Sequence, residues 1–474
     1  MNISVIFEFL KLRRHLSFSR KKMQKLQQKK LHKLLRYAYK NSEFYRSEFT
    51  KNGITLKNIN RTPLENFPKI NKQIFFENHE KILTDKNLTF IQKTSSSEKE
   101  NPMQSTSQKL QNASSSNTNC ELRITHCALK KVHSSGSTGT PKYYFYDKKA
   151  WNIVMAAITR GCMWNISLVT LIKALKNGVR FLYFGASDGL YAGSESIGST
   201  CKAFGAEILF LDINEPLDSW REKISSFKPN FIAGYPSALK ILAGLLEDGG
   251  LTFEKKSVYQ IVSCGEPLNC ELRKYLEKVF EKTVVNFYGC SESLALGVEY
   301  SKEEGLLLFD DLNYIEVIDG KMYLTCLYNF VQPVIRYEIS DRLELVENAE
   351  RQNCHAELDS ASPFTHAKIV QSREEDLMWF NKDGKKDFIH PLSVEGICIE
   401  GLLDYQFVKV NEQKFLMKIQ IKAAANLEKI KTELDDFFAK LLQEKQLNFV
   451  QYEIEKVDEI KVDEKSRKKK LVIV

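Results

Sequence analysis

Five short apolar stretches decide the fold class: FLYFG (181–185), AEILFLD (206–212), FIAGY (231–235), QIVSCG (260–265) and VVNFYG (284–289). Each has the length and the β-branched or aromatic content of a buried strand. Helix-like sequence lies between them at 215–226, 237–248 and 269–280. This alternation predicts an α/β domain with mostly parallel sheets. In such sheets ligands bind beyond the carboxyl ends of the strands, where several Gly-containing loops occur here.

The sequence changes character near residue 372. A Gly-turned hairpin at 380–388 precedes strands near 405–422, an amphipathic helix at about 427–444, a last strand near 449–457 and a basic tail. We therefore predict a large domain over 1–371 and a small, mobile α+β domain over 372–474. Two insertions interrupt the large domain: a low-complexity stretch at 94–119 with eight Ser, and an irregular stretch at 346–365.

The composition is that of a globular protein. Of 474 residues, 43% are hydrophobic and 27% charged, and no apolar run approaches the ~18 residues of a membrane span. The ten cysteines form no C-x-x-C pair, and no secretory signal is evident. Unpaired thiols without a signal predict a cytoplasmic protein.

The net charge of +9 is concentrated at the two ends. Residues 1–40 hold twelve Lys or Arg and one acid, and residues 461–474 hold six and two. A helix is predicted over 20–50, which either covers the core or contacts an anionic membrane surface. No base-stacking aromatic pattern accompanies the basic ends, so nucleic acid is not expected as a partner. The apolar positions of that helix are Leu26, Leu31, Leu34, Leu35 and Tyr39.

The strongest chemical motif is HSSGSTGTPK at 133–142. Its glycines let the backbone approach a ligand closely, and backbone N–H groups with several hydroxyls form an anion cradle. The terminal Lys adds a positive charge for phosphate. The spacing of a Walker loop is absent. The candidate phosphate-binding residues are Ser134, Ser135, Gly136, Ser137, Thr138, Gly139, Thr140 and Lys142.

The string SSGSTGTPK resembles the phosphate-binding loop of the adenylate-forming superfamily, which includes acyl-CoA synthetases, firefly luciferase and the adenylation domains of peptide synthetases. YGCSE (288–292) looks like the family's next motif, Y-G-x-T/S-E. An aromatic ring, a hydroxyl and a carboxylate suit adenine, the α-phosphate and Mg²⁺ respectively. The resemblance implies these roles for Tyr288, Ser291 and Glu292, with Gly289 beside them in the nucleotide site.

Two further loops follow predicted strands. CGEP (264–267) resembles the family's G-G-E-P loop, which lines the nucleotide pocket, and GYPS (234–237) resembles the acyl-pocket turn of the phenylacetate–CoA ligase branch. Taken singly, each of these side chains could equally belong to a simple turn or to the core. The resemblance gives Gly265 and Glu266 to the nucleotide pocket, and Tyr235 and Pro236 to the acyl pocket.

Three later motifs depart further from the family pattern. PVIRYEISD (333–341) looks like P-x-I-R-Y-x-T-G-D, whose Asp bonds the ribose hydroxyls. SREED (372–376) looks like the G-R-x-D-D hinge, whose Arg contacts ribose or phosphate, and SRK (466–468) resembles S-G-K, whose Lys reaches the carboxylate and the α-phosphate. Two simpler interpretations remain open: SREED could be an exposed run of charges, and SRK could be part of a basic tail without a catalytic role. The residues that inherit these roles are Asp341, Arg373 and Lys468.

Residues 31–80 resemble the N-terminus of phenylacetate–CoA ligase-like and CapK-like proteins. The resemblance implies a ligase that activates a small-molecule carboxylate with ATP and Mg²⁺, releases pyrophosphate and forms an acyl-adenylate, with Glu292 and Lys468 as catalytic residues. The acyl group then passes to coenzyme A or another acceptor, in polysaccharide or aromatic-acid metabolism.

Two alternatives stay open. The first is a catalytically degenerate protein that binds a nucleotide or acyl group without turnover. It is suggested by the departures from the family motifs at Ile339–Ser340, Ser372 and Arg467. The second is a protein that associates with the inner face of a membrane, which the basic N-terminus suggests.

Overall fold

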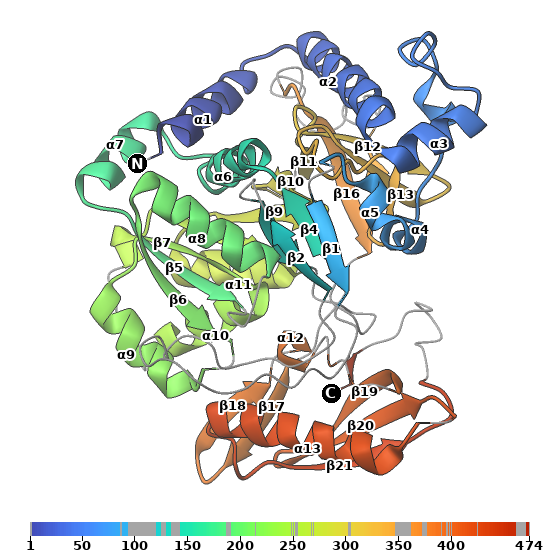
Figure 1. The fold of residues 1–474 in the computed structure, drawn as a ribbon. Helices are drawn as coiled ribbons and strands as arrows, with labels where there is room; N and C mark the ends of the chain where they lie inside the picture. Colours follow the sequence, from blue (N-terminus) through green and yellow to red (C-terminus); the bar gives the residue numbers. More distant parts are fainter. Residues whose placement is uncertain are drawn as a thin grey trace, which may run out of the picture.

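A nine-stranded sheet forms the centre of the computed structural model (Figure 1). Its strand order is β15-β16-β11-β10-β9-β8-β7-β5-β6. The structure describes residues 2–85, 88–92, 120–124, 129–133, 143–185, 191–213, 215–247, 249, 251, 255–266, 268, 270–301, 305–346, 362–371, 377–389, 391–394, 397, 399, 401–423, 425–460 and 471–473.

The five predicted strands are confirmed as neighbours in the parallel half of this sheet. Their side chains alternate between two apolar layers, as the period of a strand requires. In β5, Phe181 and Tyr183 face one layer, and Leu182 and Phe184 face the other. The bounds are β5 (Arg180–Gly185), β6 (Glu207–Asp212), β7 (Phe231–Gly234), β8 (Gln260–Cys264) and β9 (Val284–Cys290).

Helices cover both faces of the parallel half. The three predicted helices are confirmed and contribute to the layer that contains Leu182 and Phe184. A fourth helix, α8, packs on the opposite face. The bounds are α8 (Ala192–Phe204), α9 (Leu217–Phe227), α10 (Pro236–Glu247) and α11 (Cys270–Phe280), with a 3₁₀ turn η2 (Lys255–Ser257).

The prediction of mostly parallel sheets is wrong for the other half of the sheet. From β9 onward the strands pair antiparallel, so the sheet is mixed. The change of direction begins at the two-residue turn Ser291–Glu292, because two strands joined so tightly, here β9 and β10, can only run in opposite directions. The antiparallel strands are β10 (Ser293–Glu299), β11 (Leu306–Leu308), β15 (Arg342–Leu345) and β16 (Thr365–Gln371).

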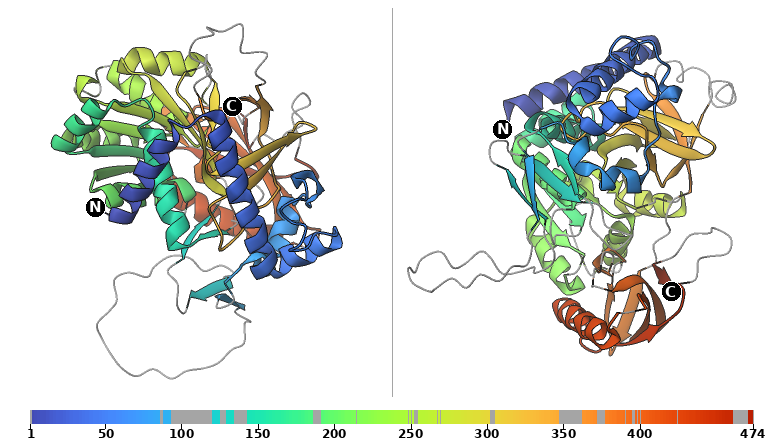
Figure 2. Two further views of the ribbon diagram at one scale, coloured as in Figure 1. Left: turned by 90° about the horizontal axis from the view of Figure 1, so that it is seen from above. Right: turned by 45° about the vertical axis from the view of Figure 1, so that its right-hand side comes forward.

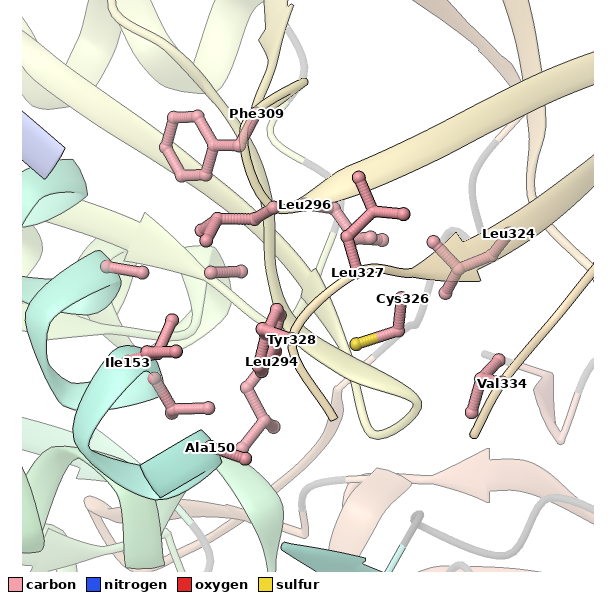
Figure 3. Packing of buried hydrophobic residues seen from close by; sticks show 14 of the residues in the cluster. Ala150, Ile153, Leu294, Leu296, Phe309, Leu324, Cys326, Leu327, Tyr328 and Val334 are labelled. Carbon is pink, nitrogen blue, oxygen red and sulfur yellow. The ribbon is translucent and has the colours of Figure 1, made fainter. Parts of the chain in front are cut away.

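Helix α6 (Lys148–Cys162) is buried along almost its whole length. Its side chains Ala150 and Ile153 approach Leu294 and Leu296 of β10, and Phe309 lies next to them (Figure 3). A helix this apolar on all sides belongs in the interior. The sequence reasoning did not identify it.

The N-terminal helices lie along one edge of the molecule (Figures 1 and 2). The single helix predicted over 20–50 is two helices, because the Ser42 hydroxyl accepts a hydrogen bond from the Tyr45 N–H at 3.3 Å and starts a new one. Of its predicted apolar positions, Leu31, Leu34 and Leu35 are buried. The bounds are α1 (Ile3–His15), α2 (Arg20–Asn41), α3 (Glu43–Lys51), η1 (Leu64–Asn66), α4 (Lys72–Glu77), α5 (His79–Ile82) and, further along the chain, α7 (Leu168–Lys176).

A buried carboxylate ties these helices to the body. Asp311 receives both Arg160 Nη atoms, at 2.7 and 3.0 Å, and lies 2.7 Å from His15 Nδ1. The Lys30 ammonium donates to the Asp311 carbonyl. Burial alone would raise the pKa of Asp311, but Arg160, His15 and Lys30 hold it well below its usual range. Burial lowers the pKa of Lys30 to about 8. Helices α1, α2 and α6 therefore meet at one charge.

A three-stranded sheet, β12 (Asn313–Ile318), β13 (Lys321–Cys326) and β14 (Tyr337–Ile339), carries the PVIRYEISD segment. Arg336 is buried at a φ of +45° and binds both Glu316 oxygens, at 3.0 and 2.9 Å, and the Glu65 carbonyl at 2.9 Å. The Tyr45 hydroxyl donates to the Pro333 carbonyl at 3.0 Å. Residues near the N-terminus thus hold this segment in place.

A four-stranded sheet, β21-β20-β19-β22, and one long helix form the C-terminal part (Figure 1). The predicted hairpin, strands and helix are confirmed. Close to the end of the sequence, the short strand β22 pairs parallel with β19. The bounds are β17 (Met378–Lys382), β18 (Lys385–Ile389), α12 (Pro391–Val394), β19 (Leu402–Asn411), β20 (Lys414–Ile421), α13 (Leu427–Glu444), β21 (Gln451–Lys456) and β22 (Val472–Ile473).

A second buried ion pair joins this part to the central sheet. Lys445 is 1% exposed and lies 3.2 Å from Asp387 Oδ1. Its ammonium also donates to the carbonyls of Ile213 and Glu215, at 2.9 and 2.8 Å. Asp387 in turn accepts from the Leu217 N–H at 2.9 Å. Burial lowers the pKa of Lys445.

Several predictions fall outside the described residues. They include the 94–119 insertion, most of the 346–365 insertion and the 371/372 boundary, which stays a prediction. Two short hairpins border the first insertion and the 134–142 loop, namely β1 (Leu88–Gln92) with β2 (Cys120–Ile124), and β3 (Lys130–His133) with β4 (Tyr143–Tyr146). Of the helices that the structure describes, none has both the length and the apolarity to cross a membrane.

Replacing Asp311 with Ala should lower the free energy of unfolding by about 3–5 kcal/mol, because Arg160 and Lys30 would lose a buried counter-charge. Urea denaturation followed by circular dichroism measures this loss. The exposed Glu344→Ala is the matched control and should change stability little. A loss below about 1 kcal/mol for Asp311→Ala would contradict the role of this carboxylate.

Candidate functional site

A cavity of about 2120 Å³ opens beyond the carboxyl ends of β7, β8 and β9. Side chains of the β17–β18 hairpin line part of its wall. The described members of the predicted site all line it, although they come from four separate segments of the chain. They are Tyr235, Pro236, Gly265, Glu266, Tyr288, Gly289, Ser291, Glu292 and Asp341.

The remaining predicted residues, Ser134–Lys142, Arg373 and Lys468, lie outside the described residues, and their roles stay predictions. The strands that flank the 134–142 loop are described. β3 pairs antiparallel with β4 and places His133 opposite Tyr143. His133 lines the cavity. Both ends of the candidate phosphate loop therefore emerge at one point beside the cavity.

Tyr288 and Asp341 meet at one side of the cavity. Tyr288 lies near the carboxyl end of β9, and Asp341 lies in the turn between β14 and β15. The Tyr288 hydroxyl donates to Asp341 Oδ2 at 2.8 Å. Burial, together with the Asp341 carboxylate, raises the pKa of Tyr288 well above its usual value, so the phenol remains a donor. The two residues predicted for adenine and ribose are thus in direct contact.

Glu292 is held by a tyrosine that the sequence reasoning missed. The Tyr144 hydroxyl donates to Glu292 Oε1 at 2.6 Å and lies 3.3 Å from the Tyr337 hydroxyl. Burial and the charge of Glu292 raise the pKa of Tyr144 well above its usual value. The signal was available in the YYFY string, which follows the loop directly and in which Tyr144 and Tyr146 are two residues apart and so lie on one face of β4.

The Ser291–Glu292 turn is fixed from both sides. The Tyr146 hydroxyl donates to the Ser291 carbonyl at 2.7 Å. The Ser293 hydroxyl donates to Asn313 Oδ1 at 2.7 Å. Before the turn, Gly289 has no room for a side chain, since a Cβ there would lie 2.7 Å from the Leu294 carbonyl oxygen. The carboxylate of Glu292 is therefore presented by rigid backbone.

Gly265 and Glu266 shape the floor of the cavity. Gly265 has a φ of +81°, and a Cβ there would lie 2.6 Å from the ring of Tyr235, so both conformation and space require glycine. The Glu266 carboxylate accepts from the Ser237 N–H at 3.2 Å and from the Ser237 hydroxyl at 2.9 Å. In this structure Glu266 caps the start of α10.

Part of the buried lining of the cavity is apolar or aromatic. It consists of Ile158, Ile197, Tyr183 and Tyr235, together with the thiols of Cys162 and Cys264. Burial raises the pKa of Cys264 to about 12, so this thiol stays protonated at neutral pH. A protonated, buried thiol behaves as a small apolar group and not as a nucleophile.

The site offers one well-placed carboxylate for a magnesium ion. Among the described residues, no group of three or more His, Cys, Asp or Glu side chains is arranged to hold a metal. Mg²⁺ in nucleotide sites is typically held by one or two carboxylates together with substrate phosphates and waters. Glu292 fits that kind of site.

Comparison with known proteins agrees with this geometry. Residues 76–307 match the AMP-binding enzyme family. The chain is a member of the AMP-binding, adenylate-forming superfamily. Over 229 residues it is 24% identical to a phenylacetate-coenzyme A ligase of Thermus thermophilus, covering 45% of this chain and 49% of that protein.

Two further relatives have similar identities. Protein CapK of Staphylococcus aureus is 21% identical over 344 residues, covering 68% of this chain and 62% of that protein. A phenylacetate-coenzyme A ligase of Escherichia coli is 22% identical over 312 residues, covering 62% and 65%. The matched stretches thus span between about half and two thirds of the lengths of these curated relatives.

Solved structures show the same fold. Two crystal structures of 2-hydroxyisobutyryl-CoA ligase cover 97% of this chain at 16% identity. The open conformation with 2-HIB-AMP and CoA gives a TM-score of 0.55 over 93% of that chain, and the thioesterification state gives 0.59 over 91%.

Replacing Glu266 with Ala should lower the free energy of unfolding by about 1 kcal/mol, because the first turn of α10 would lose its acceptor. Thermal unfolding followed by circular dichroism measures the change. Glu266→Gln keeps an acceptor oxygen and should lose less. Equal stability of wild type and Glu266→Ala would show that this contact does not support α10.

Proposed function

We propose that this chain activates a carboxylic acid with ATP, releasing pyrophosphate and forming an acyl-adenylate that is then passed to coenzyme A or another acceptor. The observation that carries the proposal is the convergence of four separate chain segments on one cavity. There a hydrogen bond joins Tyr288 to Asp341, and another holds the Glu292 carboxylate; both are partly buried.

The arrangement suits nucleotidyl transfer. A carboxylate oxygen of the substrate forms a bond to the α-phosphorus, and the bond from that phosphorus to the bridging oxygen of pyrophosphate breaks. Such a step depends on positioning and on stabilising charge. Tyr288 and Asp341 would orient the nucleoside, and Glu292 would hold Mg²⁺. The ion would supply charge neutralisation on the phosphates.

The lining of the cavity also restricts which carboxylic acids can bind. The buried part of this lining includes Ile158, Ile197, Tyr183 and Tyr235. Polar substrate groups buried there without partners would be unfavourable. An acid with an aromatic or aliphatic body therefore fits this lining better than a sugar-linked acid.

Cations near the cavity support coenzyme A as the acceptor. Arg221 and Lys240 from the large part, and Lys385 and Lys386 from the β17–β18 hairpin, all line it. Arg221, Lys240 and Lys386 are exposed. Guanidinium and ammonium groups bind phosphates, and coenzyme A carries several.

ATP–pyrophosphate exchange across a panel of aromatic and aliphatic carboxylic acids tests the first step. We expect acid-dependent exchange that falls by about 100-fold or more in Glu292→Gln, which removes the charge on the predicted Mg²⁺ ligand. Exchange absent for every acid, while ATP still binds, would instead identify a degenerate binder.

Tyr144→Phe should raise the Mg²⁺ concentration needed for half-maximal exchange by about tenfold, because Glu292 would lose the hydrogen bond that orients it. The neighbouring Tyr143→Phe is the matched control, since its ring packs near His133 at 5.9 Å and not on Glu292. An unchanged Mg²⁺ dependence in Tyr144→Phe, or an equal shift in the control, would contradict this positioning role.

A further inference from the structure

Helix α1 has apolar side chains on two opposite sides. One side is anchored in the core, where Val5, Phe9 and Leu12 are at most 7% exposed. Phe9 packs edge-on against Phe204 with the ring centroids 5.8 Å apart. His15 binds the buried Asp311. The helix therefore sits rigidly on the body and cannot turn its outer side inward.

The outer side carries Ile3, Phe7 and Leu10, which we call the outer ridge. These side chains are 82%, 67% and 59% exposed. Their spacing of four and three residues places them in one line along the helix. In the described part of the chain, three of the four most exposed large apolar side chains belong to this ridge. Soluble surfaces rarely gather apolar side chains in this way without a partner.

Exposed positive charges follow the outer ridge along the chain. Arg14 continues the same line at its C-terminal end. Exposed Lys21, Lys25 and Lys29 follow at intervals of four residues along α2. Within the described residues, these four cations have no acidic partner. The acid of α1, Glu8, is paired with Lys11 at 2.9 Å.

The position of the two helices leaves this surface accessible. Helices α1 and α2 follow one another along one edge of the molecule, and the β19–β22 sheet lies at the opposite end (Figures 1 and 2). A flat partner could therefore contact both helices without touching the C-terminal part.

We propose that the outer ridge and the cations of α1 and α2 dock this protein on the surface of an anionic lipid bilayer. Apolar side chains of an interfacial helix enter the boundary between headgroups and acyl chains, and nearby Lys and Arg bind the anionic headgroups. A second copy of the chain fits poorly, because it would bring two strongly positive surfaces together. Nucleic acid would use the cations but has no need of the apolar ridge.

The test is co-sedimentation of the full chain with vesicles of phosphatidylcholine alone or mixed with phosphatidylglycerol. We expect retention by the mixed vesicles only, and weaker retention as salt screens the charges. The triple variant Ile3→Gln, Phe7→Gln, Leu10→Gln should bind about tenfold or more weakly, because the inserted apolar surface is lost. Exposed side chains are changed, so the melting temperature should stay unchanged.

Two matched controls separate this surface from general effects. The double variant Leu403→Gln, Val410→Gln changes exposed apolar residues on β19 and should bind as wild type does. Lys21→Gln, Lys25→Gln, Lys29→Gln should reduce retention and its salt dependence, whereas Lys429→Gln, Lys431→Gln, Lys440→Gln on α13 should not.

Three outcomes would overturn the proposal: no retention by anionic vesicles, unchanged retention of the ridge variant, or equal loss in the β19 control. Sedimentation velocity adds a further check. A wild-type dimer that the ridge variant converts to a monomer, without vesicle binding, would assign the ridge to self-association. None of these outcomes depends on the proposed carboxylate activation, which the exchange assay tests separately.

Discussion

Asp311 is a carboxylate without access to water, and such a charge is tolerated only when several partners neutralise it. Its partners come from α1, α2 and α6, so the N-terminal helices and the buried helix have to assemble around it. Two residues later, Asn313 accepts a hydrogen bond from Ser293, which directly follows Glu292. The backbone at Glu292, the candidate magnesium ligand, is therefore connected to the basic N-terminal helices through Ser293, Asn313 and Asp311.

The parallel half of the central sheet and the loops after its strands could be predicted, because runs such as 181–185 and 284–289 carry a local apolar signal. The antiparallel half could not, because it depends on the three-residue strand β11 and on its pairing with β16, which lies beyond the 346–365 insertion. Helix α6 was missed because it is buried on nearly all sides, so its sequence lacks the regular alternation of apolar and polar residues that marks a surface helix.

For the candidate site, the sequence could indicate which residues matter but not which contacts hold them. Tyr144 and Glu292 are 148 positions apart, and their hydrogen bond follows only from the fold. Glu266 is another case, since its carboxylate binds the start of α10. Arg336 is a third: its motif suggested a nucleotide site, yet its guanidinium clamps Glu316 and an N-terminal carbonyl.

The contact between the C-terminal part and the central sheet has an unusual energetic character because Lys445 and Asp387 lie within it. An apolar contact of the same extent would resist separation in proportion to the hydrocarbon exposed to water. A buried ion pair differs, because hydration of the released ions largely compensates for their lost attraction. The ion pair therefore fixes the geometry of this contact and adds little to the energy that holds it together, which comes mainly from apolar packing such as that of Phe388 on Trp220.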